Sequence, residues 1–168
     1  MKSYQITAWS HELFKLQVTP GGVYIDATMG NGYDTQFLCE MAGETGKVWA
    51  FDIQEQALKA TKERLGKHGL FDDDFAAKAS FTQMEQYVKP DSVDGIYFNF
   101  GYLPGGDHEL ATKADTSVQA VETGLRLLKP GGVMALCIYS GGDTGFEEKN
   151  QILDFLRKEV YCNCKPLL

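Results

Sequence analysis

Short apolar runs alternate with helix-like segments along most of the 168 residues, and this alternation limits the fold more than any other feature. Each run is five to seven residues long, which is the length of a strand buried in a sheet. The third run is the weakest, because charged and small residues interrupt it. The runs predict strands at residues 23–27, 47–51, 75–81, 93–98 and 133–139.

Between these runs, apolar residues recur at spacings of three and four, which is typical of amphipathic helices. Pro20-Gly21-Gly22 ends the first helix and Lys129-Pro130-Gly131-Gly132 ends the fourth. Thr144 and Glu147 form a T-x-x-E capping box that opens the last helix. The predicted helices cover residues 3–17, 34–41, 54–67, 116–128 and 144–158.

Strands that are separated by helices predict right-handed βαβ units. We therefore expect an α/β protein with a Rossmann-like, mostly parallel sheet and helices on both faces. No repeat, linker or low-complexity segment divides the sequence, so residues 1–168 are expected to form a single domain. Ligands in such sheets bind beyond the carboxyl ends of the strands, where the strand order reverses.

The net charge of −7 argues against a protein whose whole surface binds nucleic acid. A local basic patch is compatible with this net charge. Lys59, Lys62, Arg64 and Lys67 lie on one predicted helix, although such a run is more often a solvated helix face.

The sequence carries no export or membrane signal. No apolar run approaches the roughly 20 residues that span a bilayer. The first residues are too polar for a signal peptide, so we expect a cytoplasmic protein with reduced thiols. Cys162 and Cys164 form a C-x-C without a second Cys/His pair, so no metal site is predicted.

The segment DATMGNGYDT, residues 26–35, follows the first predicted strand. Glycine adopts positive φ and has no Cβ, so a ligand can approach the backbone closely. Asp52 follows Gly32 by 20 positions and ends the next strand. An acidic residue at that place binds the hydroxyls of a ribose, so the ligand is predicted to be nucleoside-like.

The spacing around the glycines distinguishes two cofactors. A dinucleotide fingerprint, G-x-G-x-x-G, is incomplete here because Thr35 holds its third glycine position. Asp26, Gly30 and Gly32 instead fit D-x-x-x-G-x-G, the pattern of class I S-adenosylmethionine (SAM) methyltransferases, with Thr28 where the fuller form has another glycine. Asp26 is then expected to face the amino-acid end of SAM, directly or through water.

Asn99-Phe100-Gly101-Tyr102-Leu103-Pro104 follows the fourth predicted strand. It resembles, as N-x-x-Y, the N-P-P-Y motif of methyltransferases that act on nitrogen. The amide oxygen of Asn99 would accept a hydrogen bond from an amine and direct its lone pair, and the Tyr102 ring would stack on a base. A glycine-proline loop of purely structural importance is the alternative.

Together, DATMGNGYDT, AFDIQ, NFGYLPGGDH, LKPGG and YSGGDTGFEEK resemble a small bacterial family of SAM methyltransferases, long labelled rRNA methylases and typified by YtqB and MnmM. The resemblance covers residues 8 to 157. It implies methylation of 5-aminomethyl-(2-thio)uridine at the tRNA wobble position, with SAM as donor and the anticodon arm as partner. Whether the chain forms a homodimer stays open. The cofactor contacts that it implies are Asp26, Thr28, Gly30, Asn31, Gly32, Asp34, Thr35, Asp52, Ile53, Gln54, Gln83, Met84 and Asn99.

Methylation of an amine requires a neutral nitrogen, because a protonated amine has no lone pair. Asp107 and His108, in the segment GGDH, are the candidate proton acceptors. His11 is a weaker candidate, since it lies on the N-terminal helix.

Two features depart from the family pattern. Ala79 and Phe81 stand where the family has Asp and His. The last ten residues, EVYCNCKPLL, are too short for the usual hairpin of a sixth and a seventh strand, so a truncated or atypical end is expected. Two other functions stay open: SAM binding without turnover, and an NAD-dependent oxidoreductase, which Thr35 disfavours.

Overall fold

The computed structural model describes residues 6–70, 76–78, 80–100, 114–139 and 145–160. In this part of the chain, five parallel strands form one sheet in the order β3-β2-β1-β4-β5. This confirms the predicted α/β class and parallel sheet. The strands are β1 (Val23–Asp26), β2 (Lys47–Asp52), β3 (Ala76–Lys78), β4 (Val93–Phe100) and β5 (Leu128–Ile138).

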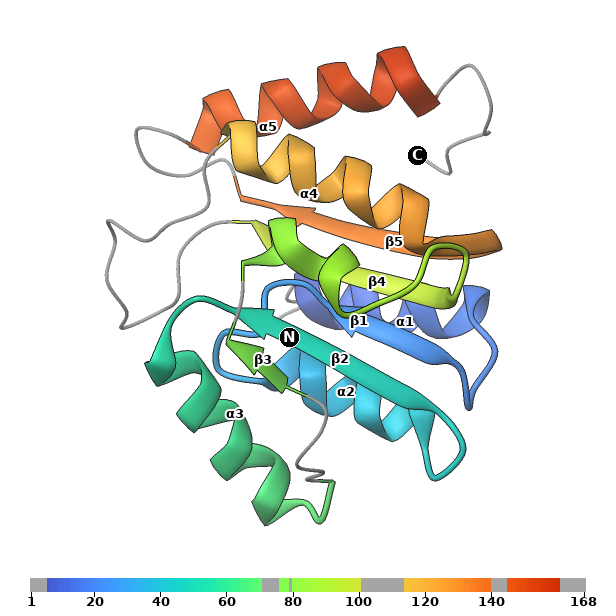
Figure 1. The fold of residues 1–168 in the computed structure, drawn as a ribbon, viewed down its shortest axis with the longest axis vertical. Coiled ribbons are helices and arrows are strands. Elements are labelled where there is room, and N and C mark those ends of the chain that lie inside the picture. The colour runs from blue at the N-terminus through green and yellow to red at the C-terminus, as the bar shows by residue number, and fades with distance from the viewer. Residues whose placement is uncertain (1–5, 71–75, 79, 101–113, 140–144, 161–168) are drawn as a thin grey trace, which may run out of the picture.

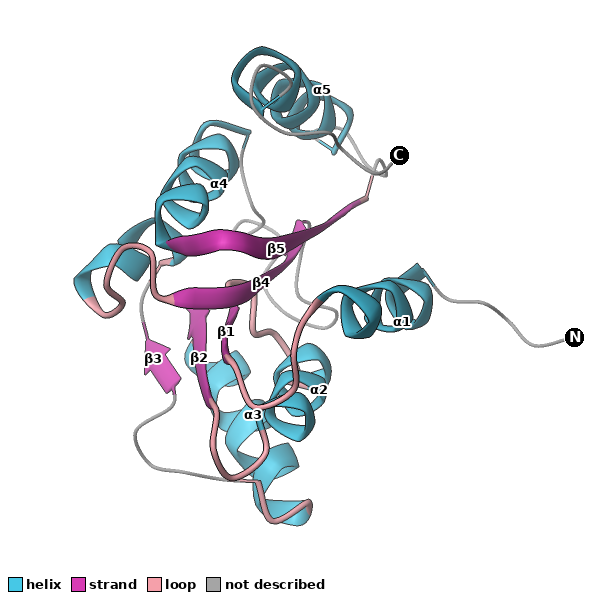
Figure 2. Ribbon diagram, turned by 90° about the vertical axis from the view of Figure 1, so that its right-hand side faces the viewer, coloured by secondary structure: helices cyan, strands magenta, loops and turns pink. Residues whose placement is uncertain are grey.

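Helices cover both faces of the sheet, as predicted (Figures 1 and 2). One face carries α1 (Ile6–Gln17), α2 (Tyr33–Ala42) and α3 (Glu55–Lys67). The other carries the 3-10 helix η1 (Phe81–Gln86), α4 (Ala114–Leu127) and α5 (Gly145–Phe155). A π-helical turn, η3 (Leu156–Val160), continues α5.

Successive residues of a strand point to opposite faces, and both faces of this sheet are buried. Tyr24 packs with Phe14 of α1 and Phe37 of α2, whereas the next residue, Ile25, belongs to the cluster that includes Ile152 of α5. Tyr24 and Ile25 are both fully buried. This two-sided burial explains why the strands are continuous apolar runs in the sequence.

The predicted boundary between α4 and β5 is wrong by several residues. Residues 129–132 do not form a separate loop but belong to β5, which pairs with β4 from Leu128 onward. The register shifts between Val93 and Gly95, and Gly131 has a positive φ of 83°. An irregular edge strand accommodates proline and glycine, so this segment stays in the sheet.

The third strand is also shorter than predicted. β3 ends at Lys78 because Ser80 caps η1: the Ser80 side chain accepts from the Thr82 backbone N–H, and the Gln83 side chain reaches the Ser80 N–H. Thr144 of the predicted capping box lies outside the described residues.

Within the described residues, β5 lies at the edge of the sheet and no strand follows it as far as residue 160. Residues 161–168 are outside the described part, so the expectation of an atypical C-terminal end stays a prediction. None of the helices in the described residues is both long and apolar enough to span a bilayer.

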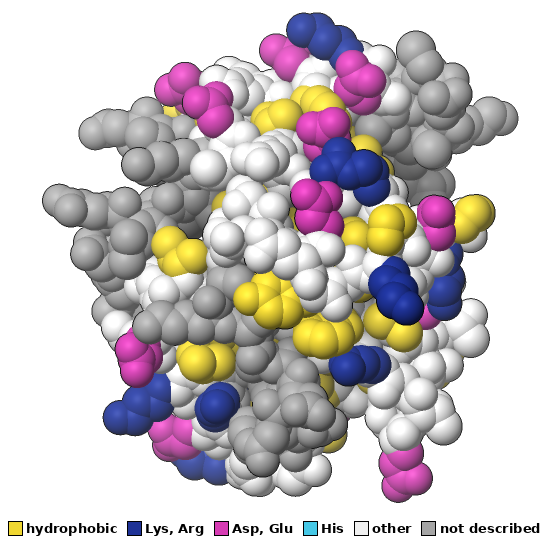
Figure 3. All heavy atoms as spheres, in the orientation of Figure 1, with side chains coloured by type: hydrophobic (Ala, Val, Ile, Leu, Met, Phe, Trp, Pro, Cys, Tyr) yellow, Lys and Arg dark blue, Asp and Glu magenta, His cyan; other side chains and the backbone are white. Residues whose placement is uncertain are grey.

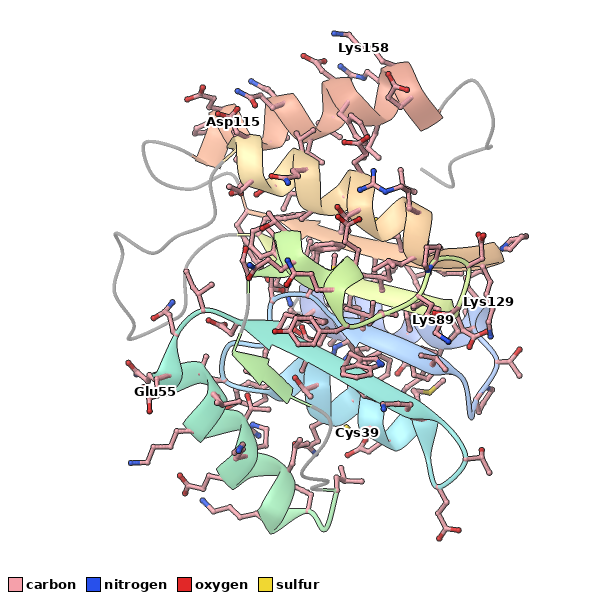
Figure 4. The ribbon with its side chains drawn as sticks, viewed as in Figure 1. Cys39, Glu55, Lys89, Asp115, Lys129 and Lys158 are labelled. Atoms are coloured by element: carbon pink, nitrogen blue, oxygen red, sulfur yellow. The ribbon has the colours of Figure 1, made fainter. Side chains whose placement is uncertain are left out.

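The carboxyl ends of the strands meet at one edge of the molecule. Figure 4 shows this edge at Glu55 and Asp115, which lie in the first turns of α3 and α4, whereas Lys89 and Lys129 lie at the opposite edge. The strand order reverses between β1 and β4. The turn after β1 and the end of β4 therefore lie at the switch point, where ligands bind in such sheets.

Candidate functional site at the switch point

The turn between β1 and α2 is tied to both neighbouring strands. The Ala27 N–H donates to the Tyr97 carbonyl at 2.9 Å, and the Met29 N–H donates to the Phe51 carbonyl at 3.0 Å. Gly30 and Gly32 have φ values of 52° and 78°. These left-handed conformations confirm that the turn needs glycine at both positions.

Contact with α3 gives Gly32 a second reason to be glycine. A Cβ atom at Gly32 would lie 2.6 Å from the Thr61 Oγ1 atom. The same Thr61 hydroxyl donates to the Gly30 carbonyl at 3.1 Å. The close approach that the sequence predicted for a ligand is made at Gly32 by a neighbouring helix.

Asp26 lies beneath this turn with no exposed surface. The Thr35 hydroxyl donates to Asp26 Oδ2 at 2.6 Å, and the Thr28 N–H donates to Asp26 Oδ1 at 3.1 Å. Burial, followed by the nearby carboxylate of Asp34, raises the pKa of Asp26. This buried carboxyl group can act on a ligand through the Thr28 and Thr35 groups that it holds.

Asp52 connects the tip of β2 to the same turn. Its Oδ2 accepts from the Gly30 N–H at 3.0 Å, and its Oδ1 accepts from the Gln54 N–H at 2.8 Å. Burial raises the pKa of Asp52, while these backbone N–H groups lower it. Asp34 and Asp52 thus lie around one turn with the buried carboxyl group of Asp26 beneath it, and the charges of Asp34 and Asp52 favour a cationic ligand.

Asn99, near the end of β4, bridges to this turn through both its backbone and its side chain. Its backbone N–H donates to Thr28 Oγ1 at 2.7 Å, and its Nδ2 donates to Asp34 Oδ2. The Asn99 Oδ1 atom is buried, and none of the described residues offers it a hydrogen bond. A buried acceptor of this kind is costly unless a ligand donates to it.

His11 is the residue that sequence reasoning undervalued. Its Nε2 atom lies 2.5 Å from Asp34 Oδ1, and its ring stacks on Phe37 with centroids 3.9 Å apart. The N-terminal helix therefore reaches the site. His11, Phe14 and Val18 have the spacing of one helix face, and Phe14 and Val18 are both buried. That pattern was the signal for an inward-facing histidine.

The other predicted contacts are placed differently. Ile53 is half exposed at the tip of β2. Gln83 uses its side-chain oxygen to accept from the Ser80 N–H at 3.3 Å, and the Met84 side chain is fully buried in the core. Tyr102, Asp107 and His108 lie outside the described residues. Among the residues described, no three His, Cys, Asp or Glu side chains are grouped to hold a metal ion.

The predicted basic run on α3 is not uniform. Arg64 turns toward the site, where its Nε donates to the Asn31 carbonyl at 2.8 Å and its guanidinium lies over the Tyr33 ring. Lys67 pairs with Glu63 at 2.7 Å. On the face shown in Figure 3, basic and acidic side chains are interspersed in the region of α3.

Comparison with known proteins places this geometry in a family context. Residues 48–161 match the family model described as "Putative rRNA methylase". A curated relative, the chloroplastic tRNA (mnm(5)s(2)U34)-methyltransferase of Arabidopsis thaliana, is 34% identical over 151 residues, which are 84% of this chain and 55% of the relative. The chain therefore spans about half the length of this relative.

Two solved structures share the fold. One, from Clostridium thermocellum and carrying the same description as the family, is 40% identical with a TM-score of 0.87, over 94% of this chain and 84% of that one. The second, SMU.1697c from Streptococcus mutans in complex with SAH, is 32% identical with a TM-score of 0.79. The match covers 95% of this chain and 84% of that one. These likenesses confirm the predicted class I methyltransferase fold.

Proposed function

This chain belongs to the "Putative rRNA methylase" family, and from that premise we propose that it is a SAM-dependent methyltransferase that acts on an amine in RNA. The observation that carries the proposal is the buried Oδ1 atom of Asn99, which lacks a donor among the described residues at the β1–β4 switch point. An incoming N–H group would supply that donor.

The charges around the turn favour SAM over NAD. SAM carries a sulfonium and an ammonium group, which the carboxyl groups of Asp34 and Asp52 attract, whereas the two phosphates of NAD would be repelled. Asp34 lies close enough to Asp26 for its carboxyl group to raise the pKa of Asp26. The oxygens of Asp52 each accept one backbone N–H and keep further acceptor capacity for ribose hydroxyls. The residues present therefore fit SAM.

The residues of the site would act by orientation. SAM supplies an electrophilic methyl group that an amine attacks in line. Asn99 Oδ1 would accept one N–H of that amine, so that the nitrogen lone pair is directed at the methyl carbon. Tyr102 is proposed to stack on the base, and Asp107 or His108 to accept the proton of the amine.

For the substrate, we propose the amine of 5-aminomethyl-(2-thio)uridine at the wobble position of tRNA, with the anticodon arm as partner. The support is the name of the Arabidopsis relative, which is 34% identical to this chain. Because the chain spans only 55% of that relative, the substrate belongs to the proposal. A cytoplasmic or organellar compartment that contains tRNA is the matching location.

Nucleoside mass spectrometry tests this proposal. Purified protein and SAM are incubated with tRNA that carries 5-aminomethyl-(2-thio)uridine, and with tRNA that lacks the aminomethyl group. We expect one added methyl group on the first tRNA and none on the second. Asn99→Ala is the control variant, and its methyl-transfer rate should fall about a hundredfold.

The two alternative functions predict other results. SAM binding in calorimetry without methylation of either tRNA would indicate a protein that binds SAM without turnover. Binding of NAD in place of SAM would indicate an oxidoreductase and would overturn the proposal.

A further inference from the structure

We infer that His11 and Asp34 form a positioning pair that holds the Asn99 amide with its nitrogen toward Asp34 and its oxygen toward the acceptor amine. The inference rests on the proposed function and adds two positioning residues to it. The pair acts through Asn99 and is not proposed to touch the reacting atoms.

The orientation of the Asn99 amide depends on its hydrogen-bond partner. An asparagine side chain has nearly the same shape after a half-turn of its amide, so packing alone does not select the end that faces a substrate. An ionised carboxylate only accepts hydrogen bonds. Because Asp34 Oδ2 contacts the amide, the Asn99 Nδ2 atom faces Asp34 and the Oδ1 atom faces away.

Asp34 is held in place by His11. Asp34 lies in the first turn of α2, and its side chain is largely buried at 12% exposure. His11 Nε2 donates to Asp34 Oδ1 at 2.5 Å, so one carboxylate bridges α1 and β4. Loss of the histidine donor would free this carboxylate to rotate away from Asn99.

The His11 ring is in contact with two aromatic rings. It stacks on Phe37 with an interplanar angle of 8° and meets the edge of Tyr97 at 5.4 Å. These contacts fix the direction of Nε2. They also raise a competing explanation, in which His11 only fills space between aromatic rings.

The Asn99 Oδ1 atom is an acceptor that the described residues leave without a donor. The Asn99 backbone is held by Thr28, and the Asn99 nitrogen is held by Asp34, so Oδ1 is the remaining polar atom of the side chain. It is buried without a donor among the described residues. An ordered acceptor directed by two fixed contacts is the arrangement that in-line attack by an amine requires.

Two substitutions of His11 separate positioning from packing. His11→Phe keeps an aromatic ring on Phe37 but loses the donor to Asp34. His11→Gln loses the ring but carries a side-chain N–H at a similar reach. Single-turnover methyl transfer to tRNA, measured at saturating SAM, compares the two variants.

We expect His11→Phe to lower the single-turnover rate about tenfold or more, because misplacement of a reacting group by about 1 Å can cost a hundredfold. His11→Gln should retain a rate within about threefold of the wild-type rate. SAM affinity and the KM for tRNA should stay within about twofold in both variants, as expected for a group that acts in the transition state. The reverse order of rates would overturn the inference.

A second measurement does not depend on activity. The chain has four asparagines, so selective ¹⁵N-asparagine labelling gives a simple spectrum of side-chain amides, in which Asn99→Ala identifies the Asn99 pair. We expect Asp34→Ala to shift this pair strongly, His11→Phe to shift it, and His11→Gln to shift it less. An Asn99 amide that is insensitive to Asp34→Ala in a folded variant would also overturn the inference.

The two measurements distinguish this inference from the proposed function. If wild-type protein methylates no tRNA while the amide spectrum responds as expected, the proposed function fails, and the orientation of the Asn99 amide by His11 and Asp34 is supported by the spectrum alone. If wild-type protein is active and His11→Phe keeps its full rate, the function stands and only the positioning inference fails. Circular dichroism melting of each variant identifies those that do not fold.

Discussion

At the scale of single residues, Asp26 couples the site to folding. Burial, then the charge of Asp34, raise the pKa of Asp26 from 3.8 to about 8. The folded state therefore holds this proton more tightly than the unfolded state does. The resulting contribution to stability is complete below the ordinary pKa near 3.8 and is lost as the pH rises through about 8.

Asp26→Asn should remove this pH dependence. The amide keeps hydrogen-bonding capacity toward Thr28 and Thr35 but does not ionise. We expect the free energy of unfolding of the variant, minus that of wild type, to increase from about pH 4 to about pH 8. Its slope should not exceed about 1.4 kcal/mol per pH unit. Urea unfolding of both proteins across this pH range measures the difference in free energy. If the two free energies of unfolding change with pH in parallel, the prediction is contradicted.

Asp52 is expected to carry cofactor affinity and to support the turn. Asp52→Ala removes the acceptor of the Gly30 and Gln54 N–H groups together with the proposed ribose contact. Loss of a charged hydrogen-bond partner costs about 2–3 kcal/mol, which is roughly 30- to 150-fold in SAM affinity. Glu55→Ala removes an exposed carboxylate three residues away and should change SAM affinity less than twofold. Calorimetric titration of SAM into both folded variants measures the two affinities, and equal affinities would contradict the proposed ribose contact.

Several site residues could be predicted from the sequence because they follow the ends of strands. Gly30, Asp52 and Asn99 lie where that rule placed them. The role of His11 could not be predicted as readily, because its partner Asp34 lies 23 positions away on another helix. Periodicity shows that a side chain faces inward, but it does not show which polar group it meets there.

At the scale of secondary-structure elements, the contact between the start of α2 and α3 depends on Gly32. Gly32 has a φ of 78°, and an added Cβ would meet Thr61 of α3 at 2.6 Å. Gly69, just beyond α3, has a φ of 66°, and no atom of the described residues lies within 4 Å of an added Cβ. The two glycines thus share backbone strain but differ in crowding.

Alanine substitution at both glycines separates these effects. Gly69→Ala should cost about 1–2 kcal/mol of stability from left-handed strain alone. Gly32→Ala should cost clearly more, because the Thr61 side chain and backbone must also move. For a chain of this size, each kcal/mol lowers Tm by about 2–4 °C. Equal melting temperatures for the two variants would show that the crowding at Gly32 is relieved without cost.

The elements themselves were predictable where local and long-range preferences agree. The apolar runs became β1, β2 and β4 with small changes at their ends. The segment from Leu128 to Gly132 was predicted wrongly, because its proline and glycines favour a turn locally. Pairing with β4 and the position at the sheet edge prevail over that preference.

At the scale of the whole molecule, the parallel order β3-β2-β1-β4-β5 brings together residues that are far apart in the sequence. Thr28 and Asn99 are 71 positions apart and share a hydrogen bond across the switch point. The net charge of the whole molecule says less about where RNA binds. A net charge of −7 leaves RNA binding to a local surface, and α3 begins at the same edge as the site.

The salt dependence of tRNA binding tests whether α3 forms that surface. Lys59 and Lys62 are exposed on α3. Lys67, on the same helix, pairs with Glu63, and Arg64 binds the turn. Each lysine that neutralises a phosphate contributes about 0.7–0.9 to the slope of log affinity against log salt concentration. The double variant Lys59→Ala/Lys62→Ala should therefore reduce this slope by about 1.4–1.8.

The matched control removes two exposed lysines from the opposite edge of the sheet. Lys89→Ala/Lys129→Ala makes the same change in net charge at residues that lie away from the carboxyl ends of the strands (Figure 4). Because counterion release reports local phosphate contacts, this control should leave the slope unchanged. Fluorescence anisotropy of labelled tRNA over a salt series measures both variants. Equal slopes for the two double variants would show that RNA approaches by an element other than α3.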